Sequence, residues 1–551
     1  MKLPLVDAVI VGAGAGGGVV AQELSRAGFK VALLERGHRY KFTETGHDEL
    51  RSQRTTVLGS AFGPDDAANP RLVRLGDDPE FRLTRPSDGA YGNVAACVGG
   101  GTFSYGAMAW RFMEQDFRMR STYGAPEGST LEDWPISYAE LEPYYTRAEW
   151  EIGVSGQANA NPFEPRRSKP YPMPPLSGNR ESEILTAAAR KLGWHPFPIP
   201  MAINSRVYDG RPACVACPHC VGFACEVNAK GSTAVNVIPR AVKTGNCDLR
   251  TNCVAKEVLL NEKGNATGVA YIKDGQLYEQ PARIVIVSCA AIESARLLLN
   301  SRNKAHPTGL GNQRDWVGRN LQGHAYAGAV GVFERETYDG TGPGARFALC
   351  DFNHGNSGIK GGGMLANEFI RLPYLFSRSM IPPRLKKWGS EYKHWIAKNY
   401  KRTIPVKGPG QEMPMWETRV EVDSNLRDAW GIPVAKLTGR RHSHDIEVGK
   451  FIASKAEQLL KAAGAIETWT TTPGRGNTGG QHQAGTCRMS ADAKTGVVDQ
   501  YCRVHSTDNV YVIDGSVHVT NGGFNPSLTI QAIAFRAAER IVQDWKKGYG
   551  V

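Results

Sequence analysis

The stretch of sequence that decides the fold runs from residue 7 to residue 35 and reads DAVIVGAGAGGGVVAQELSRAGFKVALLE. An apolar run leads into a glycine-rich turn, a helical segment and a second apolar run that ends at Glu35. In such a unit Gly12 makes the tight turn, Gly14 lets the backbone approach a pyrophosphate, and Gly17 lets helix and strand pack closely. The helix N-terminus offers free N–H groups to the phosphates, and Glu35 can accept hydrogen bonds from a ribose. The stretch therefore predicts a dinucleotide site, without separating FAD from NAD.

The length and composition predict a soluble protein. The chain has 551 residues, which is enough for two domains or two large lobes. Its hydrophobic fraction of 41% and charged fraction of 22% are ordinary for a globular protein. We expect no transmembrane helix, because there is no apolar run of about 18 residues or more. The first strand begins almost at the N-terminus and leaves no room for a signal peptide. We therefore expect a cytoplasmic chain, or one that a partner carries across the membrane.

The net charge is +12, and basic residues are densest between residues 371 and 407, around Trp388, Tyr392 and Trp395. This segment is either a solvated helix over the active site or a contact surface for a membrane or an acidic partner such as a cytochrome. Nucleic-acid binding requires clustered basic residues interleaved with stacking aromatics. This segment is the nearest candidate in the chain, but we interpret it in one of the two ways above and expect no nucleic-acid partner.

Three further segments carry a resemblance to a known family. They are residues 98–102 (VGGGT), residues 284–301 (IVIVSCAAIESARLLLNS) and residues 510–529 (VYVIDGSVHVTNGGFNPSLT). Together they resemble the glucose–methanol–choline (GMC) oxidoreductases, in the family's order. Residues 205–214 (SRVYDGRPAC) and 317–324 (VGRNLQGH) are similar to the large catalytic subunits of bacterial FAD-dependent sugar dehydrogenases. These include the gluconate 2-dehydrogenase, glucoside 3-dehydrogenase and fructose dehydrogenase types.

The resemblance implies an α/β fold: a Rossmann-like FAD-binding domain with an α+β substrate lobe that contains an antiparallel sheet. We expect the FAD domain at residues 1–110, 205–315 and 470–551, and the substrate lobe at 111–204 and 316–469, with strands at Thr418–Asp423 and Val434–Leu437. Some relatives carry a His near the positions of Ser104 and Tyr105, and in some oxidases of the family a His there holds the flavin covalently. This sequence reads TFSY at residues 102–105, without a His, so FAD is expected to be non-covalent. The residues expected at the cofactor are Gly12, Gly14, Gly17, Glu35, Arg36, Gly99, Gly100, Thr102, Val254, Asp514, Gly515 and Asn525.

Alcohol oxidation needs a base for the hydroxyl proton, and His is suited to this because its pKa lies near working pH. Of the 13 His residues, His482 lies in a polar, Gly-flanked segment, QHQAGTCRM, that resembles the family segment with the catalytic His. Asn525, just before a Pro, resembles the second catalytic position and can hold the substrate hydroxyl by hydrogen bond. Core packing for His482 and helix capping for Asn525 are the alternatives. His324, His505 and His518 are expected to be structural or to support the site indirectly.

Four cysteines lie within twelve residues, at positions 214, 217, 220 and 225. Short spacings bring several thiolates together, as iron–sulfur clusters need, whereas zinc sites mostly use two separated pairs. The resemblance implies a 3Fe–4S cluster on three Cys beside the flavin. The spacing departs from that of the relatives, so either Cys214 or Cys217 is the third ligand beside Cys220 and Cys225, and four thiolates also suit 4Fe–4S. Zinc and disulfides remain alternatives.

The sequence thus predicts an FAD-dependent dehydrogenase that oxidises a secondary hydroxyl of a sugar, sugar acid or glycoside to a ketone. Hydride goes to flavin N5 with His482 as base, and electrons leave through the iron–sulfur cluster to a cytochrome c or a quinone. A small subunit with an export signal would carry the chain to the periplasm. The alternatives are an oxygen-using sugar or glycoside oxidase that produces peroxide, and a non-catalytic flavoprotein electron carrier.

Overall fold

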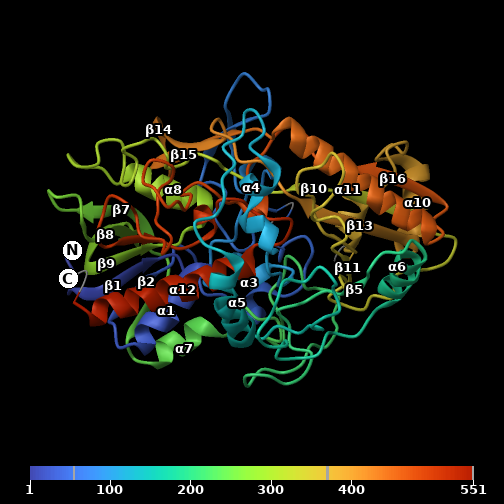
Figure 1. Ribbon diagram of the computed structural model, residues 1–551, viewed down its shortest axis with the longest axis horizontal. Coiled ribbons are helices and arrows are strands. Elements are labelled where there is room, and N and C mark those ends of the chain that lie inside the picture. Colours follow the sequence, from blue (N-terminus) through green and yellow to red (C-terminus); the bar gives the residue numbers. More distant parts are fainter. Residues whose placement is uncertain (54–55, 57, 368–370, 549–551) are drawn as a thin grey trace.

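The structure is a computed structural model that describes residues 1–53, 56, 58–367 and 371–548. Across these ranges, no helix is both long and apolar enough to span a membrane. The strands form three sheets, and the two largest lie towards opposite ends of the molecule (Figure 1).

A seven-stranded sheet is built around the glycine-rich unit, in the order β6-β2-β1-β9-β8-β7 with β17 beside β9. Its parallel strands are β6 (Cys247–Arg250), β2 (Val31–Leu34), β1 (Val6–Val11), β9 (Gln276–Val287) and β17 (Val510–Val512); β8 (Ala266–Lys273) and β7 (Val254–Leu260) extend it antiparallel. Ile10 pairs with Leu33 on one side and with Ile286 on the other. All three side chains are buried, which explains the apolar runs in the sequence.

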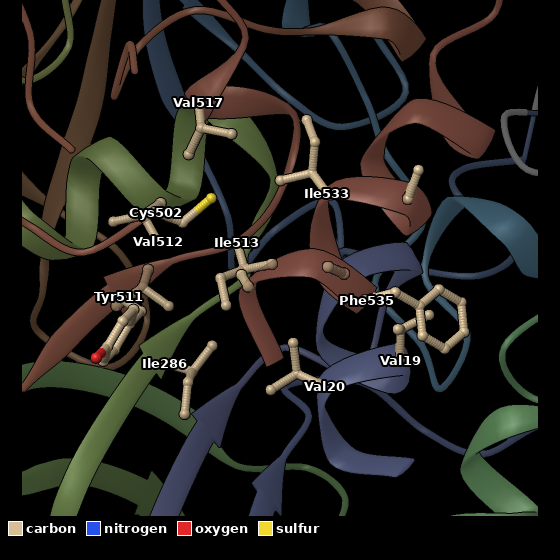
Figure 2. Packing of buried hydrophobic residues seen from close by; sticks show 14 of the residues in the cluster. Val19, Val20, Ile286, Cys502, Tyr511, Val512, Ile513, Val517, Ile533 and Phe535 are labelled. Carbon is tan, nitrogen blue, oxygen red and sulfur yellow. The ribbon is translucent and has the colours of Figure 1, made fainter. Parts of the chain in front are cut away.

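Helices cover both faces of this sheet (Figure 1). Helices α1 (Ala15–Arg26), α7 (Val237–Lys243) and α12 (Ser527–Lys546) lie on one face, and α8 (Ala290–Asn300) lies on the other. Helix α5 (Tyr138–Ile152) packs against α12. Figure 2 shows Val20 of α1 and Ile286 of β9 in the core between sheet and helices, with Phe535 of α12 against α1. This layered arrangement confirms the predicted α/β class.

The second sheet has six strands and is antiparallel throughout. Its order is β16 (Glu467–Thr471), β10 (Ala325–Val332), β13 (Thr403–Gly410), β12 (Leu365–Asn367), β11 (Phe347–Leu349) and β5 (Phe197–Pro198). Helix α11 (Ser443–Ala462) packs on β10 and β13, and α6 (Arg180–Lys191) packs beside it. This is the antiparallel sheet expected in the substrate lobe, but it contains neither of the two strands that the sequence indicated.

The two strands indicated by the sequence, β14 (Arg419–Arg427) and β15 (Pro433–Gly439), form a third sheet instead. β15 pairs in parallel with β3 (Arg71–Leu75), which pairs with β4 (Arg82–Thr84). Segment 419–439 is thus joined by a sheet to a segment that the sequence assigned to the FAD domain. The proposed division of the chain into two lobes remains a prediction.

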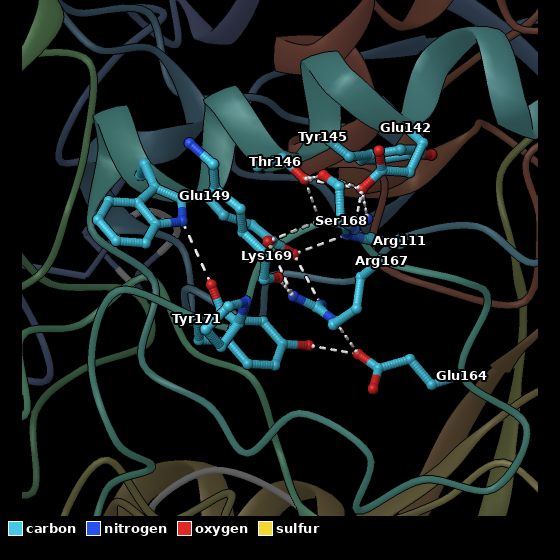
Figure 3. A network of polar contacts seen from close by, with 12 residues as sticks. Arg111, Glu142, Tyr145, Thr146, Glu149, Glu164, Arg167, Ser168, Lys169 and Tyr171 are labelled. Atoms are coloured by element: carbon cyan, nitrogen blue, oxygen red, sulfur yellow. Dashed lines mark hydrogen bonds and ion pairs between the residues drawn. The ribbon is translucent and has the colours of Figure 1, made fainter.

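A buried ion network ties residues 111–171 together (Figure 3). The Glu149 carboxylate is fully buried and pairs with Arg111 at 2.8 Å and with Arg167 at 3.1 Å. Arg111 also reaches Glu142 at 2.9 Å, and Arg167 reaches Glu164 at 2.8 Å. Removing one member would leave an unpaired buried charge, which destabilises strongly.

The basic segment 371–407 contains α9 (Pro373–Ser379) and α10 (Gly389–Asn399). Trp395 of α10 lies against Trp469 of β16, with ring centroids 6.2 Å apart, and Figure 1 shows α10 beside that edge strand. Trp388 is 73% exposed. The segment therefore covers the sheet edge and not the cavities described below. The other short helices are α2 (Phe42–Thr45), α3 (Gly101–Ser104) and α4 (Met119–Tyr123).

Candidate active site

The glycine-rich turn joins β1 to α1 as the sequence predicts. Gly12 adopts φ 102°, and a Cβ there would collide with the carbonyl oxygen of Ser288. A Cβ on Gly17 would collide with the carbonyl of Gly12. Gly14 caps α1 without any side-chain hydrogen bond, and a Cβ there would meet nothing within 4 Å. The free N–H groups of the helix therefore face open space, where a phosphate can approach.

Glu35 directly follows β2 and is nearly fully buried. Its two carboxylate oxygens accept hydrogen bonds from the backbone N–H of Ala13 at 2.9 Å and of Gly37 at 3.0 Å. Burial raises the pKa of Glu35, and these two hydrogen bonds oppose the rise. Each oxygen keeps a further lone pair for a ribose hydroxyl. Arg36 beside it lies 3.7 Å from the Glu293 carboxylate.

The second glycine-rich segment abuts the first. The Gly99 N–H donates to the Ala13 carbonyl at 2.9 Å, and a Cβ on Gly100 would lie 3.0 Å from Gly14 Cα. Both glycines have positive φ, at 98° and 51°. Thr102 is buried, and its hydroxyl donates to the Gly99 carbonyl at 2.6 Å. Two chain segments far apart in sequence therefore form one cradle.

This cradle lines a cavity of about 1420 Å³, which we call the cofactor cavity. The predicted residues that line it are Gly12, Gly14, Glu35, Arg36, Gly100, Thr102, Val254, Asp514, Gly515 and His482. Of the other predicted residues, Gly17 and Gly99 pack behind this wall, and Asn525 lines the neighbouring cavity described next. The open space at Gly14 and the tethered Glu35 fit the phosphate and ribose of a bound dinucleotide, so the residues present fit FAD.

A second cavity of about 1690 Å³, here called the substrate cavity, adjoins the first. Both cavities are lined by Gln481, His482 and Ser527, so His482 lies at their junction. The substrate cavity is lined by hydroxyl, amide and guanidinium groups; among them are Ser104, Tyr105, Tyr326, Asn477, Thr478 and Arg441. Such a lining can hydrogen-bond a hydroxyl-rich molecule.

The hydrogen bonds of His482 fix which of its nitrogens carries a proton. His324 Nε2 lies 3.0 Å from the Asn521 carbonyl and 2.9 Å from the Gly522 carbonyl, so Nε2 must be the donor. Burial lowers the pKa of His324, which keeps the ring neutral and leaves its Nδ1 as an acceptor. His482 Nδ1 lies 2.9 Å from that Nδ1 and therefore donates to it. The lone pair of His482 is then on Nε2, where a base needs it.

Asn525 completes the pair, because its amide Nδ2 donates to His482 Nε2 at 3.2 Å and lies 3.5 Å from the Tyr326 hydroxyl. Among the described residues, its Oδ1 is buried without a hydrogen-bond partner. This oxygen can accept a hydrogen bond from a substrate hydroxyl. Asn525 precedes Pro526, which caps the 20-residue helix α12, so the site also lies at the positive end of a helix dipole.

The sequence left His324 as structural or supporting without indicating which residue it supports, and the structure places it against His482. Gly323 precedes His324 in the chain. A Cβ on Gly323 would lie 2.7 Å from the Gly479 carbonyl in the loop that leads to His482. The Gly323 N–H also donates to the Glu412 carboxylate at 2.8 Å. Glycine thus permits close contact between the segments that carry the two histidines.

The four clustered cysteines are free thiols, and Cys220 is buried. Burial raises the pKa of Cys220 to about 12. Within the described ranges, no three His, Cys, Asp or Glu side chains converge as metal ligands. The thiols therefore suit an iron–sulfur cluster in number and spacing but are not arranged as a ligand set.

Two buried cations lie near these thiols. Lys230 donates to the carbonyls of Cys220 at 2.7 Å, Phe223 at 2.8 Å and Tyr105 at 3.1 Å. Arg346 interacts electrostatically with Cys214 and Cys220, and burial lowers its pKa to about 10. Within the described part of the chain, its Nε and Nη1 have no hydrogen-bond partner. The positive charge of both residues favours negative charge on the sulfurs and opposes the effect of burial, which raises the pKa of Cys220.

Comparison with known proteins identifies the family of this chain. The family models for the N- and C-terminal parts of GMC oxidoreductases match residues 7–326 and 414–534. The chain is similar to 2-methyl-1,2-propanediol dehydrogenase of Mycolicibacterium austroafricanum (30% identical, covering 97% of this chain and 95% of the relative). It is also similar to the gluconate 2-dehydrogenase flavoprotein of Pantoea cypripedii (28%, 100% and 95%) and to paromamine 6'-oxidase of Streptomyces fradiae (31%, 98% and 91%).

Solved structures show the same fold at low sequence identity. A formate oxidase structure matches with a TM-score of 0.65 and 15% identity, and the match covers 99% of this chain and 100% of that one. The family supports FAD as the cofactor and oxidation of a CH–OH group as the reaction. The resemblance inferred from the sequence is confirmed: the chain belongs to the GMC oxidoreductase family.

Proposed function

We propose that this protein is an FAD-dependent dehydrogenase that oxidises a secondary hydroxyl of a sugar, sugar acid or glycoside to a ketone. The observation that carries the proposal is the His482–Asn525 pair at the junction of the two cavities. The His482 Nε2 atom and the Asn525 Nδ2 atom lie 3.2 Å apart. The names of the relatives, a diol dehydrogenase, a gluconate dehydrogenase and a paromamine oxidase, support a hydroxylated substrate.

FAD, when bound non-covalently, supplies the acceptor for the carbinol hydride at N5. His482 Nε2 takes the hydroxyl proton, because its Nδ1 proton is committed to His324. Asn525 orients the same hydroxyl through its Oδ1, which has no hydrogen-bond partner among the described residues.

We further propose that the Cys214–Cys225 segment binds an iron–sulfur cluster and that electrons leave one at a time. The buried cations Lys230 and Arg346 support this proposal. The segment also runs along the substrate cavity: Val221 lines it, and the Gly222 N–H donates to the Ser104 carbonyl at 2.7 Å. The acceptor would be a cytochrome c or a quinone, and a small subunit with an export signal would bring the chain to the periplasm.

The second candidate function is an oxygen-using oxidase, which the 31% identity to paromamine 6'-oxidase favours. Peroxide formation with an active sugar distinguishes the two candidates. If no small subunit with an export signal exists, the protein would be cytoplasmic.

The test is anaerobic mixing of the FAD-loaded protein with a panel of sugars, sugar acids and glycosides, while flavin absorbance is followed. We expect at least one compound to bleach the flavin. His482→Ala should retain FAD and lose the bleaching, whereas the matched variant His505→Ala, outside both cavities, should retain both. Bleaching at the normal rate in His482→Ala would refute the assignment of the base.

A further inference from the structure

A third cavity, of about 1400 Å³, lies apart from the two already described. It is formed by the segment after β2 (39–42), the glycine-rich segment (98–103) and residues 224–239. It shares no lining residue with the cofactor cavity or the substrate cavity among the residues that the structure describes. We call it the basic cavity.

The charges that line the basic cavity are all positive. Arg39, Lys41, Arg211 and Lys230 line it, and no Asp or Glu does so in the described part of the chain. Arg39 and Lys41 are exposed, whereas Arg211 and Lys230 are buried. A cavity of this kind favours a ligand whose oxygens carry or develop negative charge.

Backbone carbonyls hold both buried cations in place. All three carbonyls that Lys230 contacts are backbone groups, so this ammonium is a fixed charge. Arg211 gives its two terminal nitrogens to backbone carbonyls, including that of Ile152 at 3.0 Å. Its buried Nε has no hydrogen-bond partner within the described ranges, and the Asp209 carboxylate lies 4.0 Å from it. The unpartnered donor is more than nine-tenths buried and belongs to a residue that lines the cavity.

The remaining wall is largely aromatic and aliphatic. Tyr40, Phe42 and Phe103 line it and are half-buried, so part of each ring surface is open. The rings of Tyr40 and Phe103 have centroids 6.3 Å apart and form one side. Flat rings stack favourably on such surfaces. A phosphate or another small saturated anion would leave this aromatic wall unused.

The position of the basic cavity relates it to electron transfer. Val98 and Phe103 line it, while Gly100 and Thr102, between them in the chain, line the cofactor cavity. A single segment of backbone therefore separates the two. Cys225 lines the basic cavity on its other side. A ligand bound there would lie next to both the cofactor cavity and the cysteine segment.

We infer that the basic cavity binds a quinone-type electron acceptor, a flat ring whose oxygens accept hydrogen bonds and become anionic on reduction. This inference rests on the proposed dehydrogenase function and assigns a site to its acceptor. The reaction balances: oxidation of one CH–OH to C=O releases two electrons and two protons, and reduction of one quinone to its quinol takes up both. Arg39 and Lys41 stabilise the oxygens as charge develops, and Phe42 and Phe103 hold the ring.

The first test is binding, measured by equilibrium dialysis of a water-soluble dimethoxy-methyl-benzoquinone against oxidised, FAD-loaded protein without sugar. Phe42→Ala should weaken binding about fivefold, because ring stacking is lost. Val235→Trp, which fills the cavity from its wall, should abolish binding. The double variant Arg39→Glu/Lys41→Glu should also weaken binding. The matched control is Lys393→Glu/Lys398→Glu on α10, which changes the net charge equally and should bind the quinone normally.

The second test compares acceptors under turnover. Each variant in the cavity should raise the KM for the benzoquinone while the rate of flavin bleaching by sugar stays unchanged. Turnover with ferrocenium, a cation that the basic cavity would not attract, should also stay unchanged. If sugar bleaches the flavin but Val235→Trp binds the quinone like wild type, the cavity assignment is wrong and the proposed function stands.

Two other outcomes are decisive. If no sugar bleaches the flavin, the proposed function fails, and dialysis still reports separately whether the cavity binds the quinone. If inorganic phosphate competes fully with the quinone at equal concentration, the site is a general anion site and the quinone assignment is overturned.

Discussion

His482 Nδ1 lies 2.9 Å from His324 Nδ1, and this contact determines the tautomer of His482. His324 cannot turn its other nitrogen away, because Nε2 donates to two backbone carbonyls. Arg441 and Glu412 support the same segment: Glu412 accepts from the Gly323 N–H at 2.8 Å, and Arg441 donates to the His324 carbonyl at 3.3 Å. His324 therefore acts as a positioning residue for His482.

Replacing His324 by Phe removes the acceptor for the His482 Nδ1 proton. We expect kcat to fall by about 10²-fold, within the usual range for general-base catalysis, with KM for the sugar and FAD content little changed. The acid limb of the pH profile of kcat should also move, because the surroundings of His482 change. His306→Phe is a suitable control, since His306 is buried and bonded to the Gly264 carbonyl at 3.0 Å, outside the site. Wild-type kcat in His324→Phe would exclude the positioning role.

Replacing Asn525 by Asp places a carboxylate 3.2 Å from His482 Nε2, where the amide nitrogen now lies. A nearby negative charge favours the protonated imidazole, so the pKa of His482 rises, by about one unit or more. The base is then lost at a higher pH than in the wild type. We expect the acid limb of the pH profile of kcat/KM to shift to higher pH by the same amount. Asn525→Ala removes the amide without adding charge, so it should lower the rate and shift the limb by less than Asn525→Asp does, since only the hydrogen bond to the His482 lone pair is lost.

The sequence predicts the local parts of this site better than the long-range parts. The β1–α1–β2 unit follows from residues 7–35, because apolar period and glycine spacing are local signals. The pairing of β15 with β3 joins residues more than 340 positions apart, such as Lys436 and Leu72. No periodicity within a short stretch of sequence indicates which distant strand will pair with it. The strands were therefore predicted, but the sheet that contains them was not.

The same limit applies to the side chains of the site. Motif resemblance picks out His482 and Asn525 one at a time, and the structure brings them together. The tautomer depends on His324, which is 158 positions from His482, and on two backbone carbonyls that no sequence pattern marks. For the cysteines, spacing gives the number of candidate ligands but not the convergence of their sulfurs.

Gly14→Ala tests the cofactor cradle. A Cβ at this position meets no protein atom within 4 Å, so the fold should be unaffected. The methyl group would instead occupy the space through which a phosphate approaches the helix N-terminus. We expect FAD affinity to fall by about 10-fold to 100-fold, as for overpacking of a close contact. Flavin fluorescence titration of the apoprotein measures the affinity, and the melting temperature of the apoprotein reports the fold. Gly474→Ala, also free of contacts but exposed, should change neither.

The cysteine segment is tested by metal analysis of protein purified without air. We expect about three or four iron atoms per FAD, with matching acid-labile sulfide. Cys220→Ala should lose the iron and the EPR signal, and Cys502→Ala, another buried thiol outside the segment, should retain both. Zinc in place of iron, or the absence of metal from the wild type, would refute the iron–sulfur proposal and favour the oxidase alternative.

His518 predicts how stability depends on pH. Burial lowers its pKa to about 4, below the unfolded value of about 6.5. The unfolded chain therefore takes up a proton at a higher pH than the folded chain does. The stability that neutral His518 contributes is present above about pH 6.5 and is lost as pH falls towards 4. Between about pH 7.5 and about pH 5 this loss amounts to about 2 kcal/mol.

The ring packs between Phe112 and Trp134, with centroid distances of 5.7 Å and 5.3 Å, so His518→Phe keeps an aromatic group in place without a titrating nitrogen. We expect the melting temperature of this variant to fall less than that of the wild type over the same pH range. The loss of the His518–Asn521 hydrogen bond, 3.1 Å long, lowers stability at every pH and so does not affect the comparison. His394→Phe on the exposed face of α10 should retain the wild-type dependence. An equal fall in His518→Phe and in the wild type would show that other groups, and not this buried imidazole, destabilise the protein in acid.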